Sequence, residues 1–176
     1  MKAIMLKGKI LLLFFVALGA LTSCNDDDDA NPNRLTKESF MQQAAASDLF
    51  EIQTGEMAAQ KGTMNDVKTF GQLLVTDHTM TSNQLKTLAQ QIGVTLPTTL
   101  PQDKQERKTR LEGLTGAAFD KEFANMQVVA HQEAIALYER AEDEVEDDQV
   151  ENFAEGVLPH LRMHLQEAQR LVEALK

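Results

Sequence analysis

Beyond residue 35, apolar residues recur at roughly every third or fourth position, the spacing of a helix with one buried face. The pattern is clearest over residues 65–93, where Val67, Phe70, Leu74 and Leu85 share one face. Glycine and proline fall between the periodic segments, where helices should end. No segment alternates apolar and polar residues over any length, so β-strands are not expected. The sequence therefore predicts an all-α protein.

The helix boundaries predict four long helices and one short one. Thr36 is a good N-cap for the first helix, and Gly62 and Gly93 are stop signals after the first and second. The long helices are expected over residues 36–62, 65–93, 117–144 and 149–176, and the short helix over residues 102–111. About 23 residues separate the second and third long helices, and a long middle crossover is typical of ferritin-like folds. We therefore expect a ferritin-like up-down four-helix bundle with an extra short helix in its crossover.

Pro159 falls inside the last predicted helix. Its ring and its missing N–H predict a kink at the turn that contains Glu155. The alternative is a helix that begins only after Pro159, with the proline in its first turn. The apolar period continues through this site, which favours a Pro-kinked helix.

The first 23 residues have the features of an export signal. Lys2, Lys7 and Lys9 precede an apolar run over residues 10–21, which is too short for a permanent membrane span. The run ends in Leu21-Thr22-Ser23-Cys24, which resembles the lipobox of bacterial lipoproteins. This resemblance implies cleavage before Cys24 and lipidation of its sulfur. The alternative is an ordinary cleaved signal followed by a chance free cysteine.

Residues 24–35 are predicted to form an acidic tether between a lipid anchor and a bundle domain over residues 36–176. Acyl chains on Cys24 would make a stable membrane anchor, and Asp26 to Asp29 should remain solvated. We expect an outer membrane lipoprotein of the cell envelope. The acidic run resembles surface-export signals of some Gram-negative lipoproteins, but a plain spacer would look the same. The periplasmic face and the cell surface therefore both stay open.

Composition narrows the classes of partner. The formal net charge is −10, and it becomes −13 after the loss of three lysines with residues 1–23. This acidity argues against nucleic acid as a partner, because phosphate binding needs a basic face. The absence of Trp and the single Tyr argue against stacking platforms for bases or sugars. One cysteine excludes an internal disulfide framework.

Each long helix carries a polar residue that its helical phase turns toward the core. These residues are Glu56, Asp77, His78, His131 and His164. Glu56 falls in the middle of an apolar stripe formed by Met41, Ala45, Leu49, Ile52 and Ala59. His160 lies one turn before His164, further toward the flank of its helix. The set predicts a metal site inside the bundle.

The identity of the metal stays open at this point. Imidazole and carboxylate ligands suit zinc or iron, and the nearby Met126 and Met163 would admit copper. The alternative is a set of structural histidines, hydrogen-bonded to carboxylates such as Asp77 or Glu56. If a metal is bound, we expect the ring nitrogens of the three inward histidines to lie roughly 3–4 Å apart.

Catalytic motifs are not apparent in the sequence. Di-iron carboxylate bundles carry Glu-x-x-His on two helices, but the residues three before the four histidines are Val75, Val128, Val157 and Leu161. There is no G-x-S-x-G motif and no glycine-rich phosphate loop. A metal-dependent redox enzyme is therefore disfavoured, and enzymatic activity is left open.

Several motifs occur in an order that resembles a known bacterial family. They include Phe40 with Ala44-Ala45, Glu56 with Ala58-Ala59, Phe70, Asp77-His78, Leu96-Pro97, Phe119-Asp120, Met126, His131, Leu158-Pro159 and His164-Leu165. Over about residues 36–175 the chain resembles the family called domain of unknown function 4142. The resemblance implies a ferritin-like bundle in the outer membrane, with recurring histidines at His78, His131 and His164. His160 lies outside that pattern.

Two functions remain in competition. The first is a lipid-anchored envelope bundle that binds a metal for metal handling or stress protection. The second is a non-catalytic structural or interaction module with internally satisfied histidines. Phe50 and Met57 lie opposite the predicted stripe of the first helix, so they need another partner. That partner is expected to be the short helix, a second copy of the chain or another envelope protein.

Overall fold

A computed structural model describes residues 33–176. It contains five helices: α1 (Lys37–Lys61), α2 (Asn65–Ile92), α3 (Gln102–Glu112), α4 (Gly116–Glu144) and α5 (Asp148–Ala174). Within this range there is no strand, which confirms the predicted all-α class. The export signal and Cys24 lie outside the described residues. None of the helices described is long and apolar enough to cross a membrane.

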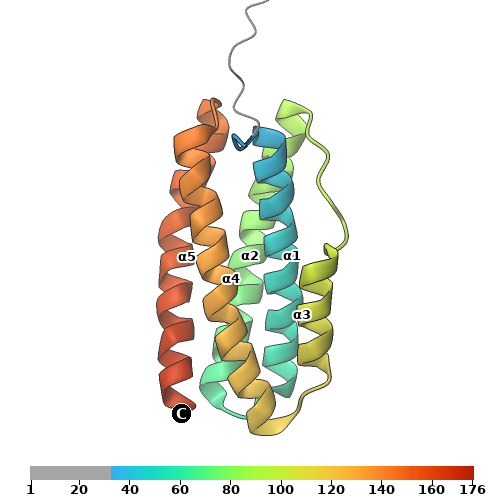
Figure 1. Cartoon of the computed structure of the whole chain (residues 1–176), viewed down its shortest axis with the longest axis vertical. Helices are drawn as coiled ribbons and strands as arrows, with labels where there is room; N and C mark the ends of the chain where they lie inside the picture. The colour runs from blue at the N-terminus through green and yellow to red at the C-terminus, as the bar shows by residue number, and fades with distance from the viewer. Residues whose placement is uncertain (1–32) are drawn as a thin grey trace, which may run out of the picture. The chain divides into compact units, whose positions relative to one another are not determined.

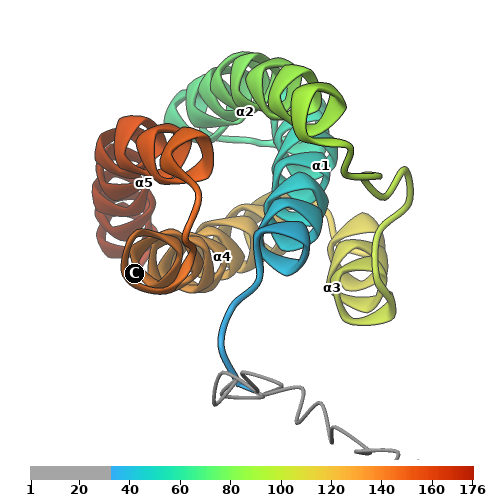
Figure 2. The same ribbon diagram turned by 90° about the horizontal axis from the view of Figure 1, so that it is seen from above.

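The four long helices form a square when the bundle is viewed along its axis (Figure 2). α1 neighbours α2 and α4, and α5 neighbours the same two helices from the opposite corner. Neighbours run in opposite directions, so α2 and α4 are parallel across a diagonal (Figure 1). The chain must therefore return along the whole bundle between α2 and α4. The extended segment over residues 93–101 and then α3 make this return on the outside, and α3 lies against α1 and α4 (Figure 1).

The starts of α1 and α2 are capped by side chains, one from the neighbouring sequence and one from another helix. The Thr36 side chain accepts a hydrogen bond from the Ser39 amide at 3.1 Å, so the predicted N-cap of α1 is confirmed. α2 has no capping side chain of its own. The buried Asp120 of α4 takes this place and accepts hydrogen bonds from the amides of Thr63 and Met64, each at 3.0 Å. It also accepts one from the Thr63 hydroxyl. Packing of α4 therefore stabilises the start of α2.

The bundle core consists of two apolar clusters separated by a polar layer. We call them the Tyr138 cluster, which includes Phe40, Met41, Leu85, Val150 and Leu161, and the Phe70 cluster, which includes Phe50, Leu74, Phe119, Phe123 and Leu171. Residues between the two along every long helix include buried polar side chains. This polar layer comprises Asp48, Glu51, Thr54, His78, Gln127, His131 and His164. All four long helices thus contribute to one buried polar layer in the middle of the bundle.

The predicted phase of α1 is wrong by about one residue. Glu56 is exposed, and Leu49, Ile52 and Ala59 are only partly buried. The buried face instead carries Phe40, Ala44, Ser47, Asp48, Glu51, Gly55 and Ala58. Apolar residues surround α1 because it contacts α2, α3 and α4. The stripe drawn through Leu49, Ile52 and Ala59 therefore lay beside the innermost face of α1.

Small residues occupy the innermost face where α1 meets α2. A Cβ atom on Gly71 would lie 2.6 Å from the carbonyl oxygen of Gly55. A Cβ atom on Gly55 would lie 2.8 Å from the carbonyl oxygen of Gly71. The two backbones therefore touch at a point that only glycine can occupy on both sides.

Phe50 packs against the short helix α3, which was one of the expected partners. Phe50 is fully buried, shares its cluster with Leu111 of α3, and has the ammonium group of Lys104 5.1 Å from its ring centroid. Met57 is partly buried against the same cluster.

α5 is one helix that continues on both sides of Pro159. The alternative of a helix that begins after the proline is therefore wrong. The kink itself stays a prediction.

Candidate metal centre

Three histidines from three different helices meet in the polar layer. His78 of α2, His131 of α4 and His164 of α5 are each at most 3% exposed. Their ring centroids are 5.3–5.7 Å apart. One ring nitrogen from each lies within 4.8 Å of the other two. We refer to these residues as the histidine triad.

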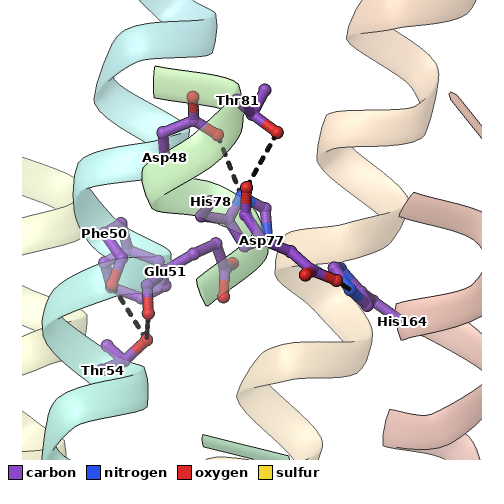
Figure 3. Close-up of polar contacts among 8 residues, drawn as sticks. All are labelled: Asp48, Phe50, Glu51, Thr54, Asp77, His78, Thr81 and His164. Carbon is purple, nitrogen blue, oxygen red and sulfur yellow. Dashed lines mark hydrogen bonds and ion pairs between the residues drawn. The ribbon is translucent and has the colours of Figure 1, made fainter. Parts of the chain in front are cut away.

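Each ring of the triad is held by one hydrogen-bond acceptor. Asp48 Oδ1 lies 2.9 Å from His78 Nδ1, and Asp77 Oδ2 lies 2.9 Å from His164 Nε2 (Figure 3). The carbonyl oxygen of Gln127 lies 2.9 Å from His131 Nδ1. All three partners are acceptors, so the contacting nitrogen must be the protonated one in each neutral ring.

In the neutral form of each ring, the other nitrogen carries a free lone pair. These atoms are His78 Nε2, His131 Nε2 and His164 Nδ1, and none has a hydrogen-bond partner among the described residues. Buried polar atoms without a partner are uncommon in folded proteins. A histidine that binds a metal shows the same arrangement, with its second nitrogen donating to a carboxylate or a carbonyl.

Two acids of α1 belong to this layer and were missed by sequence reasoning. Asp48 supports His78, and Glu51 reaches from α1 into the bundle interior (Figure 3). Glu51 is 2% exposed, and neither of its carboxylate oxygens has a hydrogen-bond partner among the residues described. Burial raises the pKa of Glu51 to about 7, even though the neighbouring His78 opposes this. Glu51 is therefore a buried carboxyl that would gain from a nearby cation.

The histidines differ in their affinity for protons. Burial, together with His78 and His164, lowers the pKa of His131 to about 3. Burial also lowers the pKa of His164, and it outweighs the hydrogen bond that His164 donates to Asp77. Burial acts in the same direction on His78, but Asp48 and Glu51 overcome it, so the pKa of His78 is raised. Two of the three rings are thus held neutral, as a metal ligand must be.

The remaining residues of the predicted site lie elsewhere. Glu56 is exposed, so its assignment to the core was wrong, for the reason given for α1. Asp77 is a hydrogen-bond partner of His164 and is not part of the triad. His160 is exposed, as is Met163, whereas Met126 is buried in the Phe70 cluster.

The donor set fits a transition-metal ion. Three imidazoles with a nearby carboxylate suit copper, zinc, iron or nickel. Ligands about 2.1 Å from one ion would be roughly 3–4 Å apart. The separations in this structure extend to 4.8 Å, so the rings would close by up to about 1 Å on binding. This distance is wider than the sequence analysis expected, but it is within the reach of side-chain rotation.

The fold is similar to those of several solved proteins. The Cu(II)-bound form of CopM superposes with a TM-score of 0.70 at 17% identity, over 81% of this chain and 99% of that chain. Its Cu(I)-bound form gives 0.67 at 17% identity, over 80% and 98% of the two chains. A DUF305 fragment from Deinococcus radiodurans gives 0.70 at 12% identity, over 78% and 95%. At these identities the likeness establishes the fold alone.

Comparison at the level of sequence identifies the family. No curated protein matches the chain. The model of one protein family, described as a domain of unknown function, matches residues 23–171. That span contains all of the histidine triad, together with Asp48, Glu51 and Asp77. The chain belongs to the DUF4142 family.

Proposed function

We propose that this chain binds a copper ion in the bacterial cell envelope through the imidazoles of His78, His131 and His164. The observation that carries the proposal is the set of three buried ring nitrogens, one per helix, that have no partner among the described residues. A buried polar atom without a partner destabilises a fold by about 1–3 kcal/mol. An ion bound to all three nitrogens would remove that penalty. The role that follows is metal handling or protection against metal stress.

Copper is the metal we favour for two reasons. Divalent copper forms the most stable complexes with nitrogen ligands among the first-row divalent ions. In addition, structural neighbours are described as CopM in its Cu(II)-, Cu(I)- and Ag-bound forms. At 17–18% identity these neighbours supply no ligand assignment. They support the choice of copper and silver as the first ions to test.

The surroundings of the triad favour the bound ion electrostatically. Asp48 and Asp77 accept hydrogen bonds from their histidines, which raises the basicity of the opposite nitrogens. Glu51 adds a second buried carboxyl from α1 to the same polar layer. A cation in the triad would favour the ionised form of Glu51. The acids of the layer would thus balance the charge of the ion.

The competing role, a structural module, requires histidines that are satisfied internally. In this structure each ring of the triad is satisfied at one nitrogen and unsatisfied at the other. The hydrogen bond at the satisfied nitrogen is enough to fix the register of the helices. The second nitrogen is the feature that favours metal binding over a purely structural role.

The test is metal binding by the purified chain and its histidine variants. The chain should take up one equivalent of Cu(II), Cu(I) or Ag(I), measured by elemental analysis after desalting and by competition with a chromogenic chelator. His78→Ala, His131→Ala and His164→Ala should each abolish high-affinity binding. His160→Ala removes an exposed histidine and is the matched control at equilibrium. Equal metal content in all four variants would refute the assignment.

The proposal includes an acyl anchor on Cys24, which would hold the domain at the outer membrane. Its support is the lipobox-like segment Leu21-Thr22-Ser23-Cys24 and the preceding apolar run. Expressed with its signal, the chain should partition with membranes, and Cys24→Ala should move it to the soluble envelope fraction. Added protease would then show whether the domain lies on the cell surface or on the periplasmic face. Membrane association that survives Cys24→Ala would contradict the anchor.

A further inference from the structure

The metal site proposed above is buried, but one member of its hydrogen-bond network reaches water. The triad, Asp48, Glu51 and Gln127 are each at most 3% exposed. The side chain of Asp77, in contrast, is 18% exposed. Asp77 therefore connects His164 to the surface of the bundle between α2 and α5.

The exposed side of Asp77 opens into a cleft of about 300 Å³. Its wall on α2 includes Asp77, Met80 and Gln84, and its wall on α5 includes Gly156 and His160. Met80 is 51% exposed, which makes it one of the few large apolar side chains that face water in the described part of the chain. His160 is also exposed. The cleft thus presents a thioether, an imidazole and a carboxylate to solvent.

This combination is selective for soft ions. Thioether and imidazole ligands bind Cu(I) well, whereas hard ions prefer sets of oxygen ligands. His160 lies one helical turn before His164 on α5. The cleft and the triad are therefore neighbours across the ring of His164.

The ring of His164 faces both regions. Its Nε2 contacts Asp77, which lines the cleft, and its Nδ1 is the atom left unpartnered in the interior. A rotation of this side chain would carry an ion-binding nitrogen from one side to the other. The rings of the other two triad histidines contact Asp48 and the Gln127 carbonyl, and neither of these residues lines the cleft.

From this geometry we propose that the cleft between α2 and α5 is the loading site of the buried triad. Met80 and His160 capture a Cu(I) ion from solvent, and Asp77 with His164 admits it to the interior. The inference rests on the proposed function, and it adds a second, transient site for a soft monovalent ion. The residues of the cleft then control the rates of loading and release, while the triad controls the final affinity.

The test separates rate from affinity. Transfer of Cu(I) from its bicinchoninate complex to the purified chain, in an anaerobic stopped-flow instrument, gives the loading rate. The double variant Met80→Leu/His160→Ala should load about tenfold more slowly, because the cleft no longer concentrates the ion. Its release should slow by the same factor, so that its equilibrium affinity stays within about twofold of the unaltered chain.

A second variant blocks the cleft without removing a ligand. Gly156 lines the cleft, and a Cβ atom on it meets nothing within 4 Å, so Gly156→Phe is chosen to fill the cleft. We expect loading to slow as in the double variant. Gln169→Phe places the same side chain at an exposed position of α5 outside the cleft, and it should load at the normal rate.

The outcomes distinguish the two proposals. Normal loading rates in both cleft variants would overturn the loading site and leave the triad assignment intact. A fall in equilibrium affinity equal to the fall in loading rate would also overturn it, because Met80 or His160 would then be a ligand of the final site. If the unaltered chain takes up no Cu(II), Cu(I) or Ag(I), both proposals fail.

Discussion

The two sides of the polar layer use the same contact in different surroundings. On the α1 side Asp48 accepts a hydrogen bond from His78, and on the α5 side Asp77 accepts one from His164, both at 2.9 Å. Asp48 is buried, however, whereas Asp77 reaches the solvent. The pKa of His78 is raised, because Asp48 and Glu51 outweigh burial, and that of His164 is lowered by burial. The comparison teaches that the number of buried acids nearby, rather than the hydrogen bond alone, sets the charge of each histidine.

The largest predicted effect is on stability, and it comes from Glu51 on the α1 side of the polar layer. Its pKa is about 7 when folded and 4.5 in the unfolded reference, so the folded state retains a proton that the unfolded state loses between these values. In metal-free protein, its contribution to the free energy of unfolding should therefore fall by about 3 kcal/mol as the pH rises from about 4.5 to about 7. Glu51→Gln should remove this decline, as measured by urea denaturation in the presence of a chelator.

The control for this prediction is on the same helix. Glu56→Gln removes an exposed carboxyl. The free energy of unfolding of this variant should depend on pH as it does in the unaltered chain. If the free energy of unfolding depends on pH in the same way in Glu51→Gln and in the unaltered chain, the pKa of Glu51 is not raised by burial.

The next effect compares the two supporting carboxylates directly. Asp48→Asn and Asp77→Asn each keep an acceptor oxygen for the histidine and remove a negative charge. Loss of such a partner lowers metal affinity by about 10–100-fold. We expect Asp48→Asn at the upper end of this range and Asp77→Asn at the lower end, because water screens the charge of Asp77. Competition with a Cu(I) chelator measures both, and equal losses would show that exposure does not distinguish the two sides.

The smallest predicted effect is on the free energy of unfolding, and it compares Gly71 of α2, which faces α1, with Gly156 of α5. Gly71→Ala should lower the free energy of unfolding by about 1–2 kcal/mol, because the strain of overpacking exceeds the gain in helix propensity. Gly156→Ala has open space and should raise it by up to about 1 kcal/mol. Thermal and urea denaturation of the matched pair would test this. A stable Gly71→Ala variant would mean that α1 and α2 can move apart at low cost.

The fold was predictable because most of its signals are local. The period of apolar residues, the Thr36 cap and the breaks at Gly62 and Gly93 all lie within a few positions of the boundaries they set. The cap of α2 by Asp120 was not predictable in this way. Asp120 lies 57 positions along the chain from Thr63, and only the packing of α4 brings it there.

The site was predictable in part, for a reason that depends on the helix. His78, His131 and His164 lie on helices whose apolar stripes marked the core correctly. On α1 the innermost face carries small residues such as Ala44 and Ala58, while larger apolar residues lie to its side. The stripe drawn through Leu49, Ile52 and Ala59 therefore pointed to Glu56 and missed Glu51. A face drawn through Phe40, Ala44, Glu51 and Ala58, at helical spacing, would have found it.

The contact between Gly55 and Gly71 has a consequence for how this half of the site was assembled. Asp48 lies seven residues before Gly55, and His78 lies seven residues after Gly71. In antiparallel helices these two steps are equal and lead to the same height (Figure 1). The backbone itself thus aligns acceptor and imidazole, and the hairpin of α1 and α2 carries them as a ready-made unit. Such a unit is portable: transplanted into another helical hairpin with the same pair of glycines, it should bring its histidine already oriented.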